Sequence, residues 1–447
     1  YLVARCVYLL YFHPLARYPG PKLAALSEAW HNRNMTCGRG CFNVRELHHK
    51  HGDVVRLGPN RLSFATPQAY RDIYGHVKHG QDRFLKNKWY ELDEPRIVRV
   101  RDPIAHAEQR RALSHAFSAR ALRDQESVIH RYVDLLMEQL ARLGNGGEKP
   151  PFEAVSQGSN RWINLIIRYL QHSFYRRNAK KYGPFSSLYM QWSSSSELRE
   201  ASEEHRTLTS EKAKRRLELG DMGRVDFFSH LLKGGKLDER SIIGNTDTLI
   251  IAGSETTATT LCGLTWYLLS HPACLQKLTD EVRGAFQSLD EITGDSTATL
   301  PYLHGCIEEG LRMFPPVTIG LPRDCPGAVI DGRYIPKDTI VQCDPLTLHT
   351  SPRYWVDSEE YRPERWLGAG LEGDDKRAFQ PFSTGPRACL GVNMAYMELR
   401  IALAKLMWTY DMEMASKIDN WYDACVDVGL WKKPDLMVKF HPRVVVQ

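Results

Sequence analysis

The sequence lacks several patterns that would place it in a small or specialised class of protein. Its ten cysteines in 447 residues are too sparse for a disulfide scaffold, and no two of them form a Cys-x-x-Cys pair. Cys37 and Cys41 have no second pair at zinc-finger spacing. Lysine and arginine are scattered along the chain, so the net charge of +6 gives no nucleic-acid footprint. We therefore expect a protein of a reducing compartment that does not bind nucleic acid.

Long hydrophobic runs and internal repeats are also scarce. The clearest apolar run is Tyr1–Phe12, interrupted only by Arg5, and as a helix it spans roughly 18 Å at ~1.5 Å per residue. A bilayer core needs about 30 Å. A proline-rich link follows, so we expect residues 1–18 to be an interfacial helix or the tail of a longer membrane anchor, and residues 19–447 to form the body. A peripheral core helix is the plainer alternative.

The body has the composition of an ordinary globular domain, with 43% hydrophobic and 25% charged residues. Strand signals are few: one hairpin is expected at 53–65 and another at 328–343, each with a turn near its middle. Helix signals dominate. Asp102 and Pro103 form a helix start, and a long apolar helix of about 50 Å is expected from Asp238 to Ser270. The pattern predicts a mainly α single domain with a small β-sheet.

The stretch AGSETT, from Ala252 to Thr257, is an unusual interruption of this long helix. Gly253 and Ser254 weaken a helix centre, and Glu255 places a carboxylate in an apolar wall. The Thr256 hydroxyl can bond a carbonyl one turn back and loosen the helix. A solvent-facing turn is the plain alternative, and the stretch does not fit a Gly-x-Ser-x-Gly nucleophile elbow. We expect a distorted turn against a cofactor, with an acid and an alcohol that pass protons.

Two further stretches carry charge in helical or aromatic surroundings. In YLHGCIEEGLRMFPP, Glu309 and Arg312 are three residues apart and share a helix face, so they can pair. Such a pair on a surface stabilises a protein by only a few tenths of a kcal/mol. Downstream, Arg365 in YRPERW offers a second guanidinium that could complete a partly buried triad.

The stretch FSTGPRACLG, residues 382–391, sets Cys389 just before an amphipathic helix. Backbone N–H groups and the helix dipole favour a thiolate there. Gly385 and Gly391 let the backbone wrap closely, Phe382 shields the sulfur from water, and Arg387 points a cation away from it. A cysteine protease would need a nearby histidine, which this stretch lacks. A thiolate in a rigid apolar loop is suited to ligating heme iron.

These four motifs together resemble the cytochrome P-450 monooxygenases. FSTGPRACLG is similar to the family's heme-ligand loop at every fixed position, AGSETT to its oxygen-activating helix, EGLR to its Glu-x-x-Arg pair, and PERW to the segment whose arginine joins that pair. The resemblance covers nearly the whole chain. YFHPLARYPGPKLAAL looks most like the microsomal members from filamentous fungi that tailor secondary metabolites.

The resemblance implies a fold and a role for each matching residue. It implies the P-450 fold, heme b (iron protoporphyrin IX) with Cys389 as its axial thiolate ligand, and Glu255 with Thr256 as the acid–alcohol pair. Glu309, Arg312 and Arg365 would be the structural triad. The family often has tryptophan where this chain has His106, and either ring can donate an N–H. The implied heme contacts are Ala252 and Gly253 of the long helix, His106, Arg110, Arg323 and Arg387 for the two carboxylates, and Phe382, Gly385 and Gly391 around the ligand.

The resemblance also implies partners and a place. Electrons would come from NADPH-cytochrome P-450 reductase, optionally with cytochrome b5, at an endoplasmic-reticulum membrane with the catalytic domain facing the cytoplasm. One atom of O2 would enter a lipophilic polyketide or terpenoid, contacted by residues 79–95, 249–252 and 315–322. The intact Glu255–Thr256 pair argues against the family's peroxide isomerases.

One departure leaves alternatives open. Between Arg110 and Ala252 the family usually has an Asp-rich stretch ending in Phe-Gly, and this chain looks shorter there, around residues 150–200. A heme-binding but catalytically inactive paralogue or truncated gene product is therefore one alternative function. A broad xenobiotic or fatty-acid hydroxylase is another.

Overall fold

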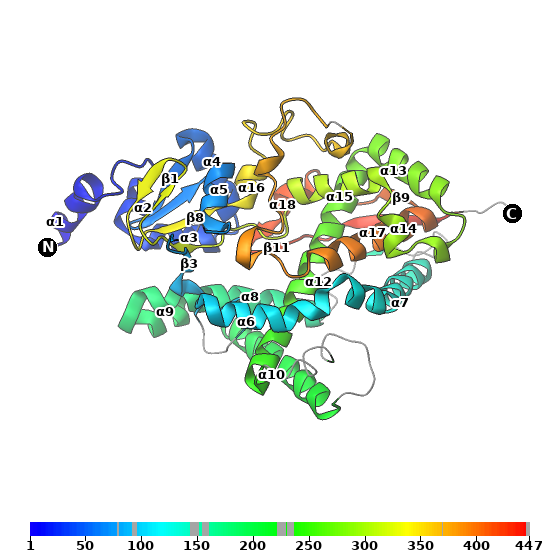
Figure 1. Cartoon of the computed structure of the whole chain (residues 1–447), viewed down its shortest axis with the longest axis horizontal. Coiled ribbons are helices and arrows are strands. Elements are labelled where there is room, and N and C mark those ends of the chain that lie inside the picture. Colours follow the sequence, from blue (N-terminus) through cyan, green and yellow to red (C-terminus); the bar gives the residue numbers. More distant parts are fainter. Residues whose placement is uncertain are drawn as a thin grey trace.

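The structure is a computed structural model that describes residues 1–77, 80–91, 96–143, 152–153, 161–220, 229, 237–368 and 370–443. It places a five-stranded sheet near the N-terminus and most of the helices beyond it, with α12 crossing the middle of the molecule (Figure 1). The prediction of a mainly α fold with a small sheet is confirmed. The α-helices are α1 (Leu2–Val7), α2 (Lys22–Leu26), α3 (Glu28–Thr36), α4 (Gly40–His51), α5 (Pro67–Tyr74), α6 (Pro103–Ser114), α7 (Ala119–Leu143), α8 (Arg161–Ala179), α9 (Ser186–Ser193), α10 (Ser196–Glu218), α12 (Glu239–Ser270), α13 (Pro272–Ala285), α14 (Gly294–Thr297), α15 (Pro301–Met313), α16 (Pro345–His349), α17 (Val392–Thr409) and α18 (Trp421–Ala424).

The larger sheet has the strand order β1-β2-β8-β5-β3, with β2 and β8 parallel and the other neighbours antiparallel. The expected hairpin at 53–65 is confirmed by the pairing of β1 with β2. The one expected at 328–343 is confirmed for β6 and β7, which pair across a turn at Asp331 and Gly332, both with positive φ, whereas residues 340–343 form β8 of the larger sheet. The strands are β1 (Val54–Gly58), β2 (Arg61–Phe64), β3 (Leu85–Lys86), β4 (Phe152–Glu153), β5 (Arg323–Asp324), β6 (Ala328–Ile330), β7 (Arg333–Ile335), β8 (Ile340–Cys343), β9 (Tyr410–Met414), β10 (Val426–Asp427), β11 (Trp431–Lys432) and β12 (Met437–Pro442).

The long helix α12 has the ends that its sequence predicts. The Asp238 carboxylate accepts the backbone N–H of Ser241 at 2.9 Å, as an N-cap does, and Pro272 begins the next helix after a break at His271. Although its sequence is largely apolar, α12 is exposed in its middle, at Ala252, Gly253 and Ser254. Two of these three, Ala252 and Gly253, face a cavity that is described below.

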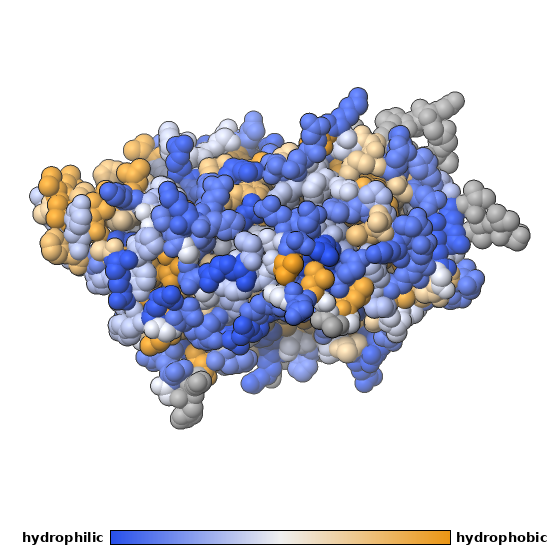
Figure 2. Space-filling model, turned by 90° about the horizontal axis from the view of Figure 1, so that it is seen from above, coloured by the Kyte–Doolittle hydropathy of each residue, from blue (hydrophilic) through white to orange (hydrophobic). Residues whose placement is uncertain are grey.

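The N-terminal apolar stretch forms α1 and one π-helical turn, Tyr8–Phe12. In the part of the chain that the structure describes, no helix is long and apolar enough to cross a membrane. Hydrophobic side chains gather at this end of the molecule, and Figure 2 shows them as one exposed patch. Its large members are Tyr1, Leu2, Val3, Val7, Tyr8, Tyr11 and Phe12.

The segment that the sequence suggests is shortened falls partly outside the described residues. Its described part forms α8 and α9, and α10 follows after the link at Ser194 and Ser195. Helix α10 packs against both α8 and α12. The shortening itself stays a prediction.

The core is packed tightly where α12 crosses α15. A Cβ on Gly263 of α12 would lie 2.6 Å from the Phe314 ring, and a Cβ on Gly310 of α15 would lie 2.3 Å from a methyl group of Leu264. Both glycines are therefore needed for close approach of the two helices, because a methyl group there would force them apart.

We predict that Gly310→Ala destabilises the protein by about 1–3 kcal/mol, the usual result of overpacking a filled core. Gly284 is a matched control, since it also lies in a helix and a Cβ there meets nothing within 4 Å. Gly284→Ala should stabilise by about 0.5–1 kcal/mol through the lower entropy of the unfolded chain. Thermal unfolding of both variants checks the prediction, and equal shifts would contradict it.

Candidate active site

Cys389 lies in a tight loop that ends at helix α17. The 3-10 turn Gly385–Arg387 precedes it, and the N-cap of α17 is Gly391, so the expected place before a helix is confirmed. The Cys389 N–H donates to the Phe382 carbonyl at 2.8 Å and closes the loop.

The two glycines of this loop are not equivalent. Gly385 has a φ of +74°, and a Cβ there would lie 2.2 Å from the Tyr74 carbonyl oxygen, so only glycine fits. Gly391 has a φ of −92°, and its Cβ would make an ordinary 3.6 Å contact with Phe117. The expectation that both glycines give the loop conformational freedom therefore holds for Gly385 alone.

The Cys389 thiol is less acidic than the sequence suggested. Its surroundings in the loop desolvate the thiolate and raise its pKa above the ordinary value, although the Gly391 N–H and the Arg110 guanidinium act in the opposite direction. The helix terminus alone therefore does not ionise this cysteine. A bound metal cation would, because a coordinating thiol loses its proton to the metal.

A cavity of about 550 Å³ lies between α12 and the Cys389 loop. Ala252, Gly253 and Thr256 line it from α12, and Phe382 and Cys389 line it from the loop side. A Cβ on Gly253 would meet nothing within 4 Å, so this turn of the helix presents open space. The lining is mostly apolar, as ligand cavities of this size usually are.

The AGSETT turn stays α-helical, which corrects the expectation of a distorted turn. The Thr256 hydroxyl donates to the Ala252 carbonyl at 2.6 Å, as its position predicts. That carbonyl has two lone pairs, so it can accept the hydroxyl without losing its backbone bond. Thr256 lines the cavity, whereas Glu255 does not. The Glu255 side chain is buried on another face of α12, with Oε2 3.7 Å from Lys433 Nζ.

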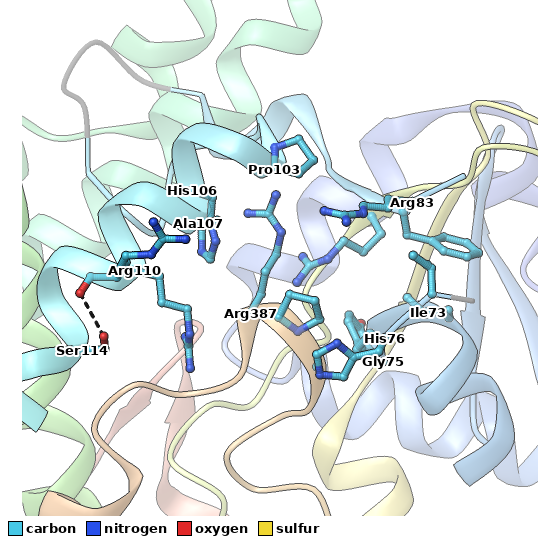
Figure 3. A pocket seen from close by; sticks show the side chains of 17 residues that line it. Ile73, Gly75, His76, Arg83, Pro103, His106, Ala107, Arg110, Ser114 and Arg387 are labelled. Carbon is cyan, nitrogen blue, oxygen red and sulfur yellow. Dashed lines mark hydrogen bonds between the residues drawn. The ribbon is translucent and has the colours of Figure 1, made fainter. Parts of the chain in front are cut away.

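One end of the cavity holds a cluster of cationic side chains. His106 and Arg110 project from one face of α6 toward Arg387 of the Cys389 loop (Figure 3), and these three residues line both the main cavity and a neighbouring one of about 520 Å³. Arg323 of β5 lines the second cavity, and Lys86 of β3 lines the first. Five separate side chains from four parts of the fold thus meet here.

Burial and mutual repulsion shape the charges in this cluster. Desolvation, reinforced by neighbouring cations, lowers the pKa of Lys86 to about 6, that of His106 to about 3 and that of Arg387 to about 10. His106 is therefore neutral and can donate an N–H, the role expected from its sequence position.

The arginines of the cluster donate to carbonyl oxygens. Arg387 bonds Val100 and Arg101 at 2.9 and 2.7 Å, and Arg110 bonds Ala388 at 2.7 Å. Neither one pairs with a carboxylate within the described residues. This end of the cavity is therefore built for an anion that the protein does not supply.

Among the lining residues that the sequence analysis did not identify as site residues, Lys86 and Glu398 carry titratable groups with shifted pKa values. Lys86 lay within a segment assigned to substrate, and only the pairing of β3 with β5 places it beside Arg323. Glu398 of α17 accepts the Thr257 hydroxyl at 3.1 Å, and burial raises its pKa to about 7. The sequence offered one signal for Glu398: it lies nine residues after Cys389, on the helix that begins at the end of the Cys389 loop.

The three segments expected to contact substrate differ in position. Leu249, Ile250 and Ala252 line the cavity, whereas residues 315–322 do not. The 79–95 segment contributes Lys86, and its members 79 and 92–95 lie outside the described residues.

Glu309, Arg312 and Arg365 meet in the core, all with fully buried side chains. Glu309 Oε1 accepts Nη2 of Arg312 at 2.8 Å and Nε of Arg365 at 2.9 Å, and Trp366 donates to Oε2 at 2.9 Å. Arg365 also pairs with Asp374 at 2.6 Å. The charges balance and the donors are satisfied, so the cluster fixes the 3-10 turn Pro363–Trp366 onto α15. The triad is more deeply buried than the partly buried one that the sequence suggested.

Comparison with known proteins assigns the family. The cytochrome P-450 family model matches residues 193–440. The chain is 41% identical over 470 residues to cytochrome P-450 monooxygenase BOA3 of Botryotinia fuckeliana, covering 97% of this chain and 92% of the relative. It is 39% identical over 465 residues to cytochrome P-450 monooxygenase poxC of Penicillium oxalicum, covering 99% and 92%. It is 33% identical over 475 residues to the trichothecene C-15 hydroxylase of Fusarium sporotrichioides, covering 99% and 96%.

The chain belongs to the cytochrome P-450 family. It is a monooxygenase whose cofactor is heme with a thiolate ligand, and it uses O2 and a redox partner to oxidise a lipophilic substrate. The cavity fits that cofactor. The open turn at Gly253 leaves room for a flat apolar ring, the cationic cluster matches its two carboxylates, and Cys389 offers a thiol to its iron.

We predict that Arg365→Met destabilises the fold by about 3–5 kcal/mol, because it leaves the buried Glu309 carboxylate short of a partner. Lys277→Met is the control: Lys277 pairs with Glu364 at 2.7 Å, but the lysine is 58% exposed. That solvent-exposed pair should contribute little to stability. Denaturant unfolding with matched m-values compares the two, and a small effect at Arg365 would show that the triad does not hold the fold.

Proposed function

We propose that this chain is a microsomal monooxygenase of fungal secondary metabolism. Cys389 would be the iron ligand, and Thr256 would be the hydroxyl that passes protons during oxygen activation. The observation that carries the proposal is the placement of Cys389 and Thr256 on opposite walls of one cavity with a cationic end. When bound, heme supplies a redox-active iron that activates dioxygen.

Different residues around the cavity would contact different parts of the cofactor. Arg110, Arg323 and Arg387 would receive its two carboxylates, which neutralise cations that otherwise repel one another. The same carboxylates would favour the protonated form of Lys86, whose pKa burial and the neighbouring arginines lower to about 6. Neutral His106 adds an N–H donor. Phe382 lines the cavity beside Cys389, and an apolar side chain there would limit the access of water to a metal-bound sulfur.

Thr256 holds a proton beside the reacting centre. Its hydroxyl donates to the Ala252 carbonyl at 2.6 Å, so its oxygen keeps free lone pairs toward the cavity. An oxygen in that position can accept a proton from water and pass its own onward. Glu255, one residue earlier, is the proposed source of protons for this path.

The apolar lining of the cavity and the exposed patch at α1 support a proposal for the substrate and for the location of the protein. Ile97, Val98, Leu249 and Ile250 give the cavity an apolar wall, which suits a polyketide or terpenoid skeleton. The relatives named above come from fungi, and one is a trichothecene hydroxylase. The exposed patch at α1 would rest on the endoplasmic-reticulum membrane, with the catalytic domain in the cytoplasm. The electron donor would be NADPH-cytochrome P-450 reductase, optionally with cytochrome b5.

The first test is the carbon-monoxide difference spectrum of the reduced protein. Wild type should give the strongly red-shifted Soret band of a thiolate-ligated heme, and Cys389→Ser should lose it because an alcohol does not replace the thiolate. Cys37→Ser, which changes an exposed cysteine, should keep it. A red-shifted band in Cys389→Ser would show that the ligand assignment is wrong.

The second test concerns proton supply. Thr256→Ala should uncouple the enzyme: NADPH and oxygen are consumed, but hydrogen peroxide replaces product, with a loss of about 10²-fold or less in coupled turnover, the lower range for a positioned proton-transfer group. Ser254→Ala removes a neighbouring hydroxyl that makes the same bond to a carbonyl, Ile250 at 2.7 Å, and should leave coupling unchanged. Product per NADPH is the measurement, and equal coupling in both variants would remove Thr256 from the path.

A further inference from the structure

Glu255 is held in a buried cluster that the sequence motif does not contain. Glu255 is 4% exposed, and its side chain points from α12 toward the residues that follow β11. Lys433, from that chain segment, places its ammonium 3.7 Å from Glu255 Oε2 and is itself buried at 7% side-chain exposure. This ammonium is the cation that faces the carboxylate.

The ammonium of Lys433 is shared with a second acceptor. It donates to the Thr259 hydroxyl oxygen at 2.7 Å and, more weakly, to the Trp431 carbonyl at 3.3 Å. Thr259 lies one helical turn after Glu255 on α12. The shorter bond goes to the neutral hydroxyl, while the carboxylate lies beyond hydrogen-bond distance.

The Glu255 carboxylate therefore has an opposite charge nearby but lacks a hydrogen bond from it. Within the described residues Glu255 Oε2 has no hydrogen-bond partner. Burial raises the pKa of Glu255, and Lys433 opposes this by favouring the charged form. An incompletely satisfied buried carboxylate changes its protonation readily when its one cation moves, because desolvation already favours the neutral acid.

Among the described residues, two thiols also face this cluster. Burial raises the pKa of Cys262, on α12, above its ordinary value, and raises that of Cys425, which faces Lys433, to about 12. Both therefore stay neutral across the working range of the enzyme. Lys433 is left as the group that controls the charge of Glu255.

Lys433 is also rigidly placed. The Trp431 indole donates to the Pro315 carbonyl at 2.9 Å and stacks on Phe314 at 4.9 Å between ring centroids. The C-terminal β10–β11 hairpin thus fixes where the ammonium meets α12.

We propose that Lys433 is a positioning residue for oxygen activation, dividing its ammonium between Thr259 and Glu255 and so setting when Glu255 can give up a proton. The inference rests on the proposed role of Glu255 as proton source for Thr256. Removing Lys433 makes Glu255 a neutral acid that holds its proton more tightly. Removing the Thr259 hydroxyl leaves the Lys433 ammonium free to pair with Glu255 alone, which keeps the Glu255 carboxylate ionised.

The test is an infrared titration of the Glu255 carboxyl in the heme-loaded full chain, with Glu255→Gln used to assign its band. Lys433→Met should raise the midpoint by about one to three pH units, the range for loss of an opposite charge at this distance. Thr259→Val should lower it. Lys433→Arg should restore a midpoint near that of wild type, and Lys432→Met, at the exposed neighbouring lysine, should leave it unchanged.

A structural role alone would not move two midpoints in opposite directions. The pH profile of product formed per NADPH should shift with the infrared midpoint in each variant. A midpoint that stays fixed in Lys433→Met, or that rises in Thr259→Val, overturns the proposal. If Lys433→Met fails to fold, Thr259→Val decides alone.

The proposed function is tested separately in the same samples. The carbon-monoxide spectrum should be the same in all variants, because none of these side chains lines the heme cavity. Loss of the spectrum in wild type would refute the assignment of Cys389, whereas the infrared titration does not depend on that band. Shifted midpoints with unchanged coupling would overturn the link from Glu255 to the reaction.

Discussion

Uncompensated positive charge beside the Cys389 loop is the constraint on which the site depends. Arg110, Arg323 and Arg387 come from separate elements, and their repulsion in a desolvated place opposes folding; the same burial and repulsion lower the pKa of Lys86 to about 6. Carbonyl oxygens relieve part of that cost. A dianionic cofactor would relieve the rest, so binding and folding stabilise each other, as for any ligand that binds only the folded state.

The remaining architecture can be understood as support for this cluster. The sheet fixes Lys86 and Arg323 on adjacent strands, α6 presents His106 and Arg110 one turn apart, and the Gly385 turn brings Arg387 under them. The buried triad is remote from the cavity and electrically balanced. Its neutrality explains why one cluster of arginines can be purely structural while the other calls for a ligand.

The sequence was sufficient for the features that local chemistry decides. The ends of α12, the cap of α6 at Asp102, both hairpins and the Cys389 loop before α17 depend on residues close together in the chain. Lys86 and Lys433 could not be found that way. Each acquires its meaning from a partner far away in the sequence, Arg323 for one and Glu255 for the other, and only the assembled sheet and hairpin bring those pairs together.

The AGSETT motif shows why a short pattern can mislead about direction. Adjacent residues of an α-helix point about 100° apart, so Glu255 and Thr256 cannot both face one narrow cavity. The structure turns the alcohol toward the cavity and the acid toward the C-terminal hairpin. In the proposed mechanism the two groups would act in sequence rather than side by side, with the hydroxyl at the cavity and the carboxylate controlled by Lys433 on another face of the helix. A lysine outside the motif would then be part of its chemistry, because burial raises the pKa of Glu255 and the nearby Lys433 ammonium opposes that rise.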